Sequence, residues 1–590
     1  MKIKEISMAE LEAMTTPNTQ YFCDTETIGF YGEVRLLQVR AIEWDEVCYI
    51  QFPGALNIIK WHNDAAKQGC TFVYQNAHYD LTTYQQQGHK KWVPEFGAFI
   101  DTMLAGRLAL PHLESHSLDN LMTETLGFDP YAKQGLDKKT LQGSDWSKKV
   151  LTNDQLLYAC TDVWFLPNVL AKVSSALDSE SYLLDMHMLH YCLDFQWNGV
   201  PVDIEKLQDL WQAQQRLIAD LRKVVTVNPN SWQQVRKWIG QDESDDLALA
   251  KFAQQGCEKS ASIRKLRKAL KLAGFLEKFQ TEDGRIYGKV KPSAKSGRTT
   301  SDDQNIQQLP RASKGVFGTK GLLLYADYAQ LELRTICAIS RDGTMEELFR
   351  EGKDLHTYAS DMLLTTEESL RAEGYTDDEI KVIRKKNRQI AKTGNFSLLY
   401  GGGAGMFIDI LVKTADIWLD HMTASVIKRQ WLNLFRGINA WQQRGISNYQ
   451  RGKLGSTPLG RRYKAKLMTD QLNIENQGAG AEVAKLAMHY LYKSGFKTKY
   501  PNWYVCNFIH DSFILENPNP EHDLDEAREV AVLLADCMQR AWFSMSELMA
   551  IKDLPMPVEV SCGQNWGDIE SDNVPNLFDY KLDGMATYGK

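Results

Sequence analysis

Two aspartates in the second half of the chain lie next to apolar runs, where burying a carboxylate costs free energy unless a cation pairs with it. Asp327 ends an apolar run, residues 322–326 (LLLYA), and Asp511 lies in a predicted tight turn between two further apolar runs. If that hairpin pairs beside the first strand, the two carboxylates converge. Two divalent ions ~3.5 to 4 Å apart could then lie between them, which is the arrangement of a two-metal phosphoryl-transfer site.

A second set of acidic residues lies in the first 175 residues. Asp24 and Glu26 are two apart on a predicted strand and therefore point to one face. Asp80 opens a helix that follows an apolar strand, and Tyr158 and Asp162 share a helix face at i, i+4 spacing. Four carboxylates and one tyrosine at the edges of regular elements, in this order, predict a two-metal phosphodiesterase site.

One predicted helix, residues 376–403, carries two cations followed by two aromatic rings on a single stripe. Arg388, Lys392, Phe396 and Tyr400 recur at every fourth residue, so the stripe extends over ~18 Å. A nucleoside triphosphate has the same layout, anionic at one end and aromatic at the other. The alternative, a core stripe whose cations reach solvent, leaves the order of cations and rings unexplained.

The charge distribution favours a nucleic-acid partner close to these motifs. The whole chain of 590 residues has a net charge of −7, but residues 259–314 hold 14 Lys or Arg against 5 Asp or Glu, a local net charge of +9. Residues 381–392 (KVIRKKNRQIAK) contain no acidic residue. A solvated helix face is the alternative. Because both runs flank the predicted sites, we expect them to contact a phosphate backbone.

Composition excludes several other classes of protein. The chain has 43% hydrophobic residues and no apolar stretch of signal-peptide or membrane-span length, which predicts a cytoplasmic protein with no membrane partner. Its 10 cysteines never form Cys-x-x-Cys, so neither a zinc site nor a disulfide framework is expected. His112 and His116 have the spacing of a helical zinc pair, but no third ligand is nearby.

The carboxylates of the first 175 residues resemble those of the DEDD family of 3′–5′ proofreading exonucleases, in its tyrosine subclass. This resemblance implies an RNase H-like α/β domain over residues 1–178, with a mixed sheet covered by helices. It also implies that Asp24, Glu26, Asp80 and Asp162 bind two Mg²⁺ ions, and that Tyr158 orients the attacking water.

The motifs of the second half resemble those of family A DNA polymerases. ADYAQLELR (residues 326–334), the R-x-x-x-K-x-x-x-F-x-x-x-Y-G stripe and HD (residues 510–511) are similar to that family's motifs A, B and C. SGRTTSDDQNIQQLP (residues 296–310) and NIENQGAGAE (residues 473–482) look like its duplex-binding segments. The implied fold is multidomain, α/β and α+β, with the exonuclease domain followed by a right-hand polymerase.

In that right-hand polymerase, residues 179–300 would form a mostly helical thumb with the start of the palm. Residues 301–590 would form the palm and the fingers, the fingers spanning about 345–440. The length of 590 residues also suggests three or four domains, because a domain typically holds ~100 to 200 residues.

The resemblance also implies a role for each matching residue. Asp327, Asp511 and the backbone carbonyl of Tyr328 would bind two Mg²⁺ ions, for which Mn²⁺ can substitute. Arg388 and Lys392 would be catalytic as well, and Glu332 would exclude a ribose 2′-hydroxyl. The residues that line the incoming nucleotide would be Gln330, Glu332, His356, Arg388, Lys392, Phe396 and Tyr400. Those that touch the minor groove would be Arg298, Asn305, Gln307, Asn473, Gln477 and His510.

The expected activity is template-directed transfer of deoxynucleotides to a primer 3′-hydroxyl, with 3′–5′ proofreading, in a phage-type replicative enzyme. Its partners would be primer-template DNA and dNTPs, and a helicase-primase or processivity factor could join them. We expect a monomer in the host bacterial cytoplasm. Only 23 residues precede Asp24, which leaves no room for a 5′-nuclease domain.

Two alternatives and two departures accompany this prediction. A single-subunit RNA polymerase shares the palm chemistry, but Glu332 and the exonuclease carboxylates oppose it. A DNA-binding scaffold with inactive sites is opposed by six intact carboxylates. Ser512 stands where the family often has Glu, and Thr469 where it often has Arg.

Overall fold

The chain folds into two compact units, each with its own sheet. The computed structural model describes residues 1–590 except 293, 303, 416, 522, 571–578 and 583–590. Unit 1 comprises Met1–Gly199, Tyr287–Asp302 and Leu454–Lys464, and unit 2 comprises Val200–Ile286, Asp303–Lys453 and Ala465–Lys590. Every helix in the described part of the chain is too short or too polar to span a bilayer. The domain boundaries at residues 178 and 300 stay a prediction.

Unit 1 contains a mixed six-stranded sheet in the order β1-β4-β3-β2-β5-β6. Its strands are β1 (Lys2–Glu5), β2 (Gln20–Ile28), β3 (Glu33–Ala41), β4 (Glu46–Gln51), β5 (Thr71–Tyr74) and β6 (Phe99–Asp101). Strand β2 pairs antiparallel with β3 and parallel with β5. The expected mixed sheet is therefore confirmed.

Helices pack on this sheet and around one apolar core. They are α1 (Met8–Met14), α2 (Ala55–Ala66), α3 (Ala77–Gln87), α4 (Thr102–Ala109), α5 (Leu118–Leu126), α6 (Pro130–Lys133), α7 (Lys138–Gln142), α8 (Asn153–Val173) and α9 (Glu180–Asn198). Helix α8 contacts β2, β3 and β4, and α3 contacts β3 and β6. Helix α8, which carries Asp162, thus packs on β2, the strand that carries Asp24 and Glu26, and α3, which carries Asp80, packs on other strands of the same sheet.

Two distant segments complete unit 1 beside α9. They form the strand pairs β9 (Lys289–Lys291) with β10 (Thr300–Asp302), and β12 (Gly455–Ser456) with β13 (Arg462–Tyr463). Arg461 donates to Asp185 of α9 at 2.6 Å, and both side chains are almost fully buried. Ser181 also donates to the Leu459 carbonyl at 2.9 Å. A buried ion pair is strongly destabilising to break, so it fastens a segment that is 276 residues away in sequence.

Unit 2 contains an antiparallel five-stranded sheet in the order β14-β15-β11-β16-β17. Its strands are β11 (Gly318–Tyr328), β14 (Tyr504–Ile509), β15 (Ser512–Asn517), β16 (Val558–Asn565) and β17 (Asp579–Leu582). The hairpin predicted around Asp511 is β14–β15, and it pairs with β11 as expected. Strand β11 is longer than the predicted residues 322–326.

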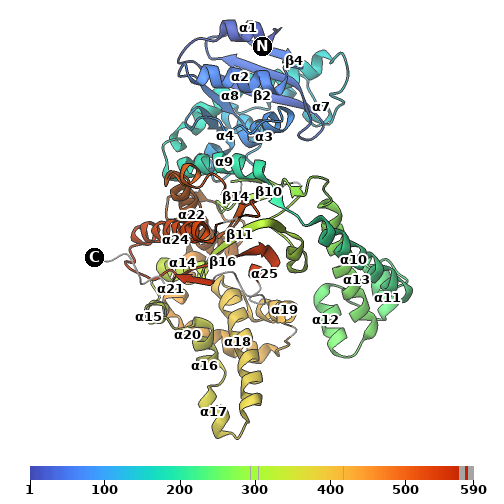
Figure 1. Ribbon diagram of the computed structural model, residues 1–590, viewed down its shortest axis with the longest axis vertical. Coiled ribbons are helices and arrows are strands. Elements are labelled where there is room, and N and C mark those ends of the chain that lie inside the picture. Colours follow the sequence, from blue (N-terminus) through green and yellow to red (C-terminus); the bar gives the residue numbers. More distant parts are fainter. Residues whose placement is uncertain (293, 303, 416, 522, 571–578, 583–590) are drawn as a thin grey trace. The chain divides into compact units, whose positions relative to one another are not determined.

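Helix α24 covers one face of this sheet and leaves the other to the acidic residues. The Tyr328 hydroxyl donates to the Met538 carbonyl of α24 (Leu524–Leu548) at 2.8 Å. Successive side chains alternate across a strand, so Asp327 points to the face opposite α24. Helix α22 (Met468–Lys493) packs beside α24, as Figure 1 shows.

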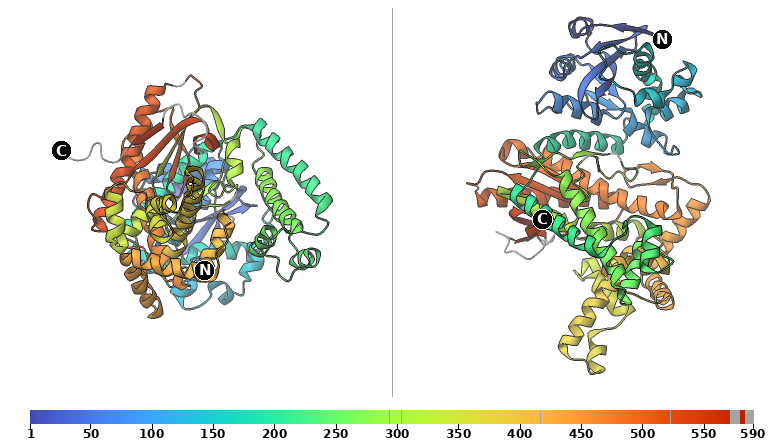
Figure 2. Two further views of the ribbon diagram at one scale, coloured as in Figure 1. Left: turned by 90° about the horizontal axis from the view of Figure 1, so that it is seen from below. Right: turned by 90° about the vertical axis from the view of Figure 1, so that its right-hand side faces the viewer.

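The remaining helices of unit 2 form an arm and a helical group around the nucleotide stripe, which is the predicted nucleotide-binding set of Arg388, Lys392, Phe396 and Tyr400. In the arm, α10 (Ile204–Val224) and α13 (Glu258–Lys278) run side by side (Figures 1 and 2) around a small core of their own, with α11 (Trp232–Ile239) and α12 (Asp246–Gln254). The strands β7 (Val200–Pro201) and β8 (Arg285–Ile286) pair at its base. The other helices are α14 (Leu331–Ser340), α15 (Gly343–Arg350), α16 (Leu355–Leu363), α17 (Glu367–Ala372), α18 (Asp377–Leu399), α19 (Ala404–Ala415), α20 (His421–Leu434), α21 (Arg436–Gln450), α23 (Phe496–Lys499) and α25 (Trp566–Glu570).

Candidate active sites and a basic pocket

Three carboxylates meet in unit 1 at the junction of β2 and α8. Oxygen atoms of Asp24, Glu26 and Asp162 all lie within 4.8 Å of one another. Asp24 and Glu26 come from alternate positions of β2, and Asp162 comes from the middle of α8. Asp80 lies in the first turn of α3, outside this group, but its charge reaches Asp24 and Glu26. The structure therefore brings three of the four predicted carboxylates together and places Asp80 near enough for its charge to act on two of them.

Electrostatics make this cluster a suitable site for divalent cations. Burial raises the pKa of Asp24 well above its usual range, and the charges of Asp162 and Asp80 raise it further. Burial also raises the pKa of Asp80 to about 8 and that of Asp162 to about 7. Neighbouring buried carboxylates repel one another unless a cation lies between them, and hard divalent cations prefer carboxylate oxygens. The donor set fits Mg²⁺.

Two tyrosines flank Asp162. Tyr158 is buried one helical turn before it, and burial followed by the charge of Asp162 raises the Tyr158 pKa. The hydroxyl that donates to Asp162 is instead that of Tyr131, whose ring centroid is 5.6 Å from that of Tyr158. Sequence reasoning missed Tyr131, because it lies 31 residues from Asp162 and in no shared periodic element.

The acidic site of unit 2 lies at the end of β11. Ser512 donates to Asp327 Oδ1 at 3.3 Å, and Tyr325 lies 3.4 Å from Asp327 Oδ2. Burial raises the pKa of Asp327 to about 6. Burial also raises the pKa of Tyr325, and the charges of both Asp327 and Asp511 add to that rise. Asp327 therefore lies beside the Tyr325 phenol, and the charge of Asp511 reaches the same phenol. The carboxylate oxygens of the two aspartates again suit Mg²⁺.

Glu332, which we expect to lie against the sugar of the incoming nucleotide, is hydrogen-bonded by Tyr400, the last residue of the nucleotide stripe. Tyr400 donates to Glu332 Oε2 at 2.9 Å. Asn476 of α22 donates to the Tyr400 hydroxyl and to the Glu332 carbonyl, both at 3.0 Å. Asn476 was not predicted, although it lies inside the recognised segment 473–482. This network joins three helices, α14, α18 and α22.

The nucleotide stripe lies along α18 as the periodicity predicts. Arg388 pairs with Asp354 at 2.9 Å. Burial by itself would raise the pKa of Asp354, but the hydrogen bonds from Thr357 and Arg388 and the charge of Arg388 lower it to about 2. Lys392 is exposed. The Phe396 ring lies 5.9 Å from that of His356, so both predicted side chains meet. Asp354 was missed because no sequence pattern relates it to α18.

The expected minor-groove residues are spread over both units. Gln307 donates to the Phe508 carbonyl at 2.8 Å, and its backbone N–H donates to Asn305. Asn473 and Gln477 lie on α22, His510 has a φ of 57° in the hairpin turn, and Arg298 belongs to unit 1. Asn473 Oδ1 and Gln330 Oε1 are buried with no hydrogen-bond partner among the described residues. Such acceptors suit a polar ligand.

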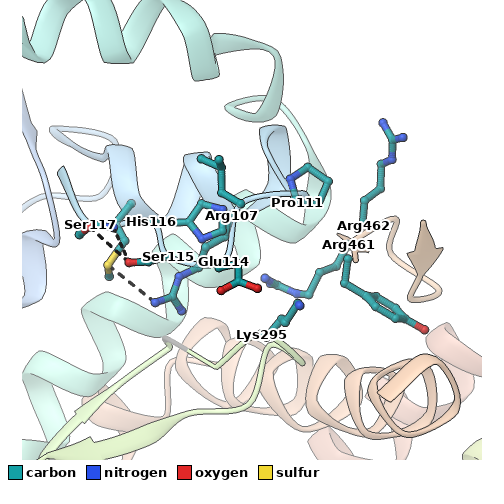
Figure 3. Close-up of a pocket in the computed structure, with 12 residues that line it drawn as sticks. Arg107, Pro111, Glu114, Ser115, His116, Ser117, Lys295, Arg461 and Arg462 are labelled. Atoms are coloured by element: carbon teal, nitrogen blue, oxygen red, sulfur yellow. Dashed lines mark hydrogen bonds between the residues drawn. The ribbon is translucent and has the colours of Figure 1, made fainter. Parts of the chain in front are cut away.

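A basic pocket of about 450 Å³ lies in unit 1 beside α4. The cations Arg107, Lys295, Arg461 and Arg462 line it from three separate segments, together with the loop 111–117. Arg107 Nη1 is buried with no hydrogen-bond partner among the described residues. Figure 3 shows Glu114 facing Lys295 and Arg461, whereas Arg462 points away from them.

The loop of this pocket is tied to the chain that leads to Asp80. Gln75 donates to the His116 carbonyl at 2.8 Å. The next two backbone N–H groups donate to Asp101, which caps α4. His116 itself hydrogen-bonds to the Leu110 carbonyl at 2.9 Å and His112 to Glu124 at 3.2 Å. In these contacts the two histidines serve the local structure.

Both parts of the chain match known protein families. Residues 219–568 match the family described as DNA polymerase family A, and residues 8–178 match that described as 3′–5′ exonuclease. DNA polymerase I of Aquifex aeolicus is 26% identical over 93% of this chain and 96% of its own length. The DNA polymerase of Mycobacterium phage D29 is 24% identical over 79% of this chain and 81% of its own length.

Other relatives match over a smaller share of their length, and solved structures match in fold. The thermostable DNA polymerase I of Thermus filiformis is 27% identical over 49% of this chain and 33% of its own length. The POL domain of Pol1 from M. smegmatis, solved with DNA primer-template and dNTP, superposes with a TM-score of 0.71 at 20% identity. That superposition covers 95% of this chain and 98% of the other.

Proposed function

The chain belongs to DNA polymerase family A and is a DNA-directed DNA polymerase with a 3′–5′ exonuclease domain, and on this premise we propose how its residues divide the two reactions. Asp327 and Asp511 serve primer extension. Asp24, Glu26, Asp80 and Asp162 serve removal of the 3′ nucleotide, with Tyr158 beside the attacking water. The observation that carries this proposal is that each carboxylate group is built on the sheet of a different compact unit.

Both reactions depend on metal ions, for which Mg²⁺ is the usual choice. We propose two ions at each site, with Mn²⁺ as a substitute. Asp327, Asp511 and the Tyr328 carbonyl would hold them in unit 2, and the four exonuclease carboxylates would hold them in unit 1. Bound there, the ions activate the attacking oxygen and stabilise the charge of the leaving group.

The nucleotide would lie along α18, with its phosphates at Arg388 and Lys392 and its base nearer the C-terminal end of the helix. Arg388 would exchange its ion pair with Asp354 for the triphosphate, since an exposed pair is worth only ~0 to 1 kcal/mol, and Lys392 would add a second charge. Phe396 and His356 present rings toward the sugar and base. Gln330 and Glu332 would complete the site. Arg298, Asn305, Gln307, Asn473, Gln477 and His510 would contact the primer-template.

Tyr400→Phe is expected to relax discrimination against ribonucleotides about ten- to a hundredfold. The hydroxyl that holds Glu332 is lost, and a hydrogen bond to a charged group is worth ~1.5 to 3 kcal/mol. The ratio of kcat/KM for dATP to that for ATP measures this selectivity. Tyr500→Phe is the matched control, because it removes a similar tyrosine–glutamate bond, to the exposed Glu529 at 2.8 Å.

Glu332→Ala provides the reference against which the loss of selectivity in Tyr400→Phe is compared. It should relax selectivity more than Tyr400→Phe does, since the obstructing side chain is itself removed. If Glu332→Ala relaxes selectivity and Tyr400→Phe does not, Glu332 acts without its tyrosine. Unchanged selectivity in Glu332→Ala contradicts its assignment as the gate.

We further propose that the basic pocket of unit 1 contacts phosphates of the single strand that reaches the exonuclease carboxylates. Its cations come from α4, from Lys295 and from Arg461 and Arg462. The loop that forms its wall is bonded to Gln75, five residues before Asp80. Clustered Lys and Arg side chains bind a phosphate backbone without reading sequence.

Lys295→Gln combined with Arg462→Gln is expected to weaken binding of a single-stranded oligonucleotide about three- to tenfold. Both side chains are exposed, so the buried Arg461–Asp185 pair is left intact. Fluorescence anisotropy in EDTA at several salt concentrations measures affinity, and the slope against log salt should fall by ~0.7 for each phosphate contact that is lost. Lys67→Gln with Lys172→Gln is the control, with the same change of charge at exposed residues outside the pocket. Equal weakening by both pairs would contradict a specific contact.

Extension of a labelled primer on a longer DNA template tests the function as a whole. With Mg²⁺ and four deoxynucleotides the primer should grow, and without nucleotides it should shorten from its 3′ end. If the primer shortens but never grows, the chain is an exonuclease whose polymerase site is inactive. Absence of both would contradict the proposal for this chain by itself.

The biological setting of the enzyme stays a prediction. A phage-type replicative role is supported by the match to the Mycobacterium phage D29 enzyme, of which 81% is covered. A cytoplasmic location, a monomeric state and a helicase-primase or processivity factor as partner are part of the same prediction.

A further inference from the structure

Asp327 is flanked by unlike neighbours on the two sides of β11. On the β15 side lies Ser512, whose hydroxyl donates to Asp327 Oδ1 at 3.3 Å. On the β16 side, Glu559 is the direct cross-strand partner of Asp327, and its charge acts on that carboxylate. Like charges directly opposite each other repel, so this repulsion favours an Asp327 carboxylate turned toward Ser512 over one turned toward Glu559.

A tyrosine two residues earlier on the same strand completes the contact. The hydroxyl of Tyr325 lies 3.4 Å from Asp327 Oδ2 and 3.3 Å from Ser512 Oγ. Tyr325 and Asp327 are two apart on β11, so both side chains lie on the face opposite α24. Each carboxylate oxygen of Asp327 thus has one hydroxyl beside it, and each keeps a lone pair for a cation.

The two hydroxyls depend on each other for their geometry. Ser512 is small and buried, which leaves room for the phenol to reach across from β11. A glutamate at position 512 would bring a further negative charge against Asp327, in addition to that of Glu559. In this chain that position supplies a hydrogen-bond donor, and Tyr325 supplies another.

We infer that Tyr325 and Ser512 are positioning residues that hold the Asp327 carboxylate in its metal-binding orientation, in place of a third carboxylate at position 512. The inference rests on the proposed function of Asp327. The chain orients the carboxylate before a cation arrives, so that less conformational freedom is lost on binding.

Metal binding at the palm tests this inference with a readout that does not depend on catalysis. The parent for all variants carries Asp24→Asn and Glu26→Gln, which removes the main ligands of the exonuclease cluster. Electron paramagnetic resonance titration with Mn²⁺ then reports binding at the palm. The Mg²⁺ concentration for half-maximal primer extension is measured in parallel, and thermal melting checks that each variant is folded.

Tyr325→Phe and Ser512→Ala are each expected to weaken Mn²⁺ binding about three- to tenfold, and to raise the half-maximal Mg²⁺ concentration in proportion. Together they should weaken it by less than the product of the single effects, because the two hydroxyls share one network. Ser512→Thr keeps a hydroxyl and should restore parental binding. Tyr504→Phe is the matched control. It removes a phenol of the same sheet whose hydroxyl donates a 3.1 Å hydrogen bond to Glu516.

The possible outcomes separate this inference from the proposed function. A parent that binds Mn²⁺ but does not extend a primer contradicts the proposed function. If the parent extends and both single variants bind Mn²⁺ as it does, the inference is overturned while the function stands. Equal weakening by Tyr504→Phe would also overturn it, because the effect would then be a general loss of sheet packing.

Discussion

Asp327→Ala lowers primer extension by on the order of a thousandfold or more, while 3′ degradation continues at the wild-type rate. Metal ions supply several kcal/mol of transition-state stabilisation, and each 1.36 kcal/mol is a factor of ten in rate. Degradation is spared because its carboxylates belong to a different compact unit with its own core. Single-turnover extension with dNTPs and shortening without them measure the two rates on one substrate.

The control for this variant is an aspartate of the same unit without a role in the site. Asp525→Ala removes an exposed carboxylate from the first turn of α24 and should leave both rates unchanged. Asp327→Asn keeps the size of the side chain and should lose extension as fully as the alanine variant does. Parallel loss of both activities in a folded Asp327→Ala protein would show that the sites are not separate.

Asp24→Ala should abolish 3′ shortening, again by on the order of a thousandfold, and leave nucleotide incorporation intact. Asp24 is one of three carboxylates whose oxygens lie within 4.8 Å of one another, so its loss leaves a cation short of ligands. Mispaired primer ends, which must be trimmed before extension, provide the sensitive assay. The variant should extend matched primers normally and should retain the mispaired nucleotide.

Asp45→Ala is the companion variant for this experiment, because it removes an exposed aspartate of the same unit outside the cluster. It should trim mispaired ends at the wild-type rate. If Asp24→Ala also trims them at that rate, the assignment of the N-terminal site is wrong.

Local spacing predicted the acidic sites well because each ligand lies at a defined place in a regular element. The period of a strand puts Asp24 and Glu26 on one face, and the turn at His510 and Asp511 follows directly from two apolar runs. The stripe on α18 likewise needs only the helical repeat. These features are set by backbone geometry over a few residues.

Residues that support the sites were missed because their partners are distant in sequence. Tyr131 reaches Asp162 from 31 residues away, Asp354 reaches Arg388 from 34, and Asn476 reaches Glu332 from 144. Polar residues of these types are common on any protein surface. A hydrogen bond across two elements leaves no period in the chain, so one sequence cannot reveal it.

The amino-acid sequence by itself determined the face of its own element that each carboxylate, cation and ring of the proposed sites occupies. Only the tertiary structure decided what surrounds them: Tyr325 and Ser512 on either oxygen of Asp327, Glu559 opposite it, and the cations of three segments around one pocket. The physical reason is the range of the forces involved. Side-chain direction follows from local backbone dihedrals, whereas strand register and the pairing of buried charges are selected by the packing of the whole unit.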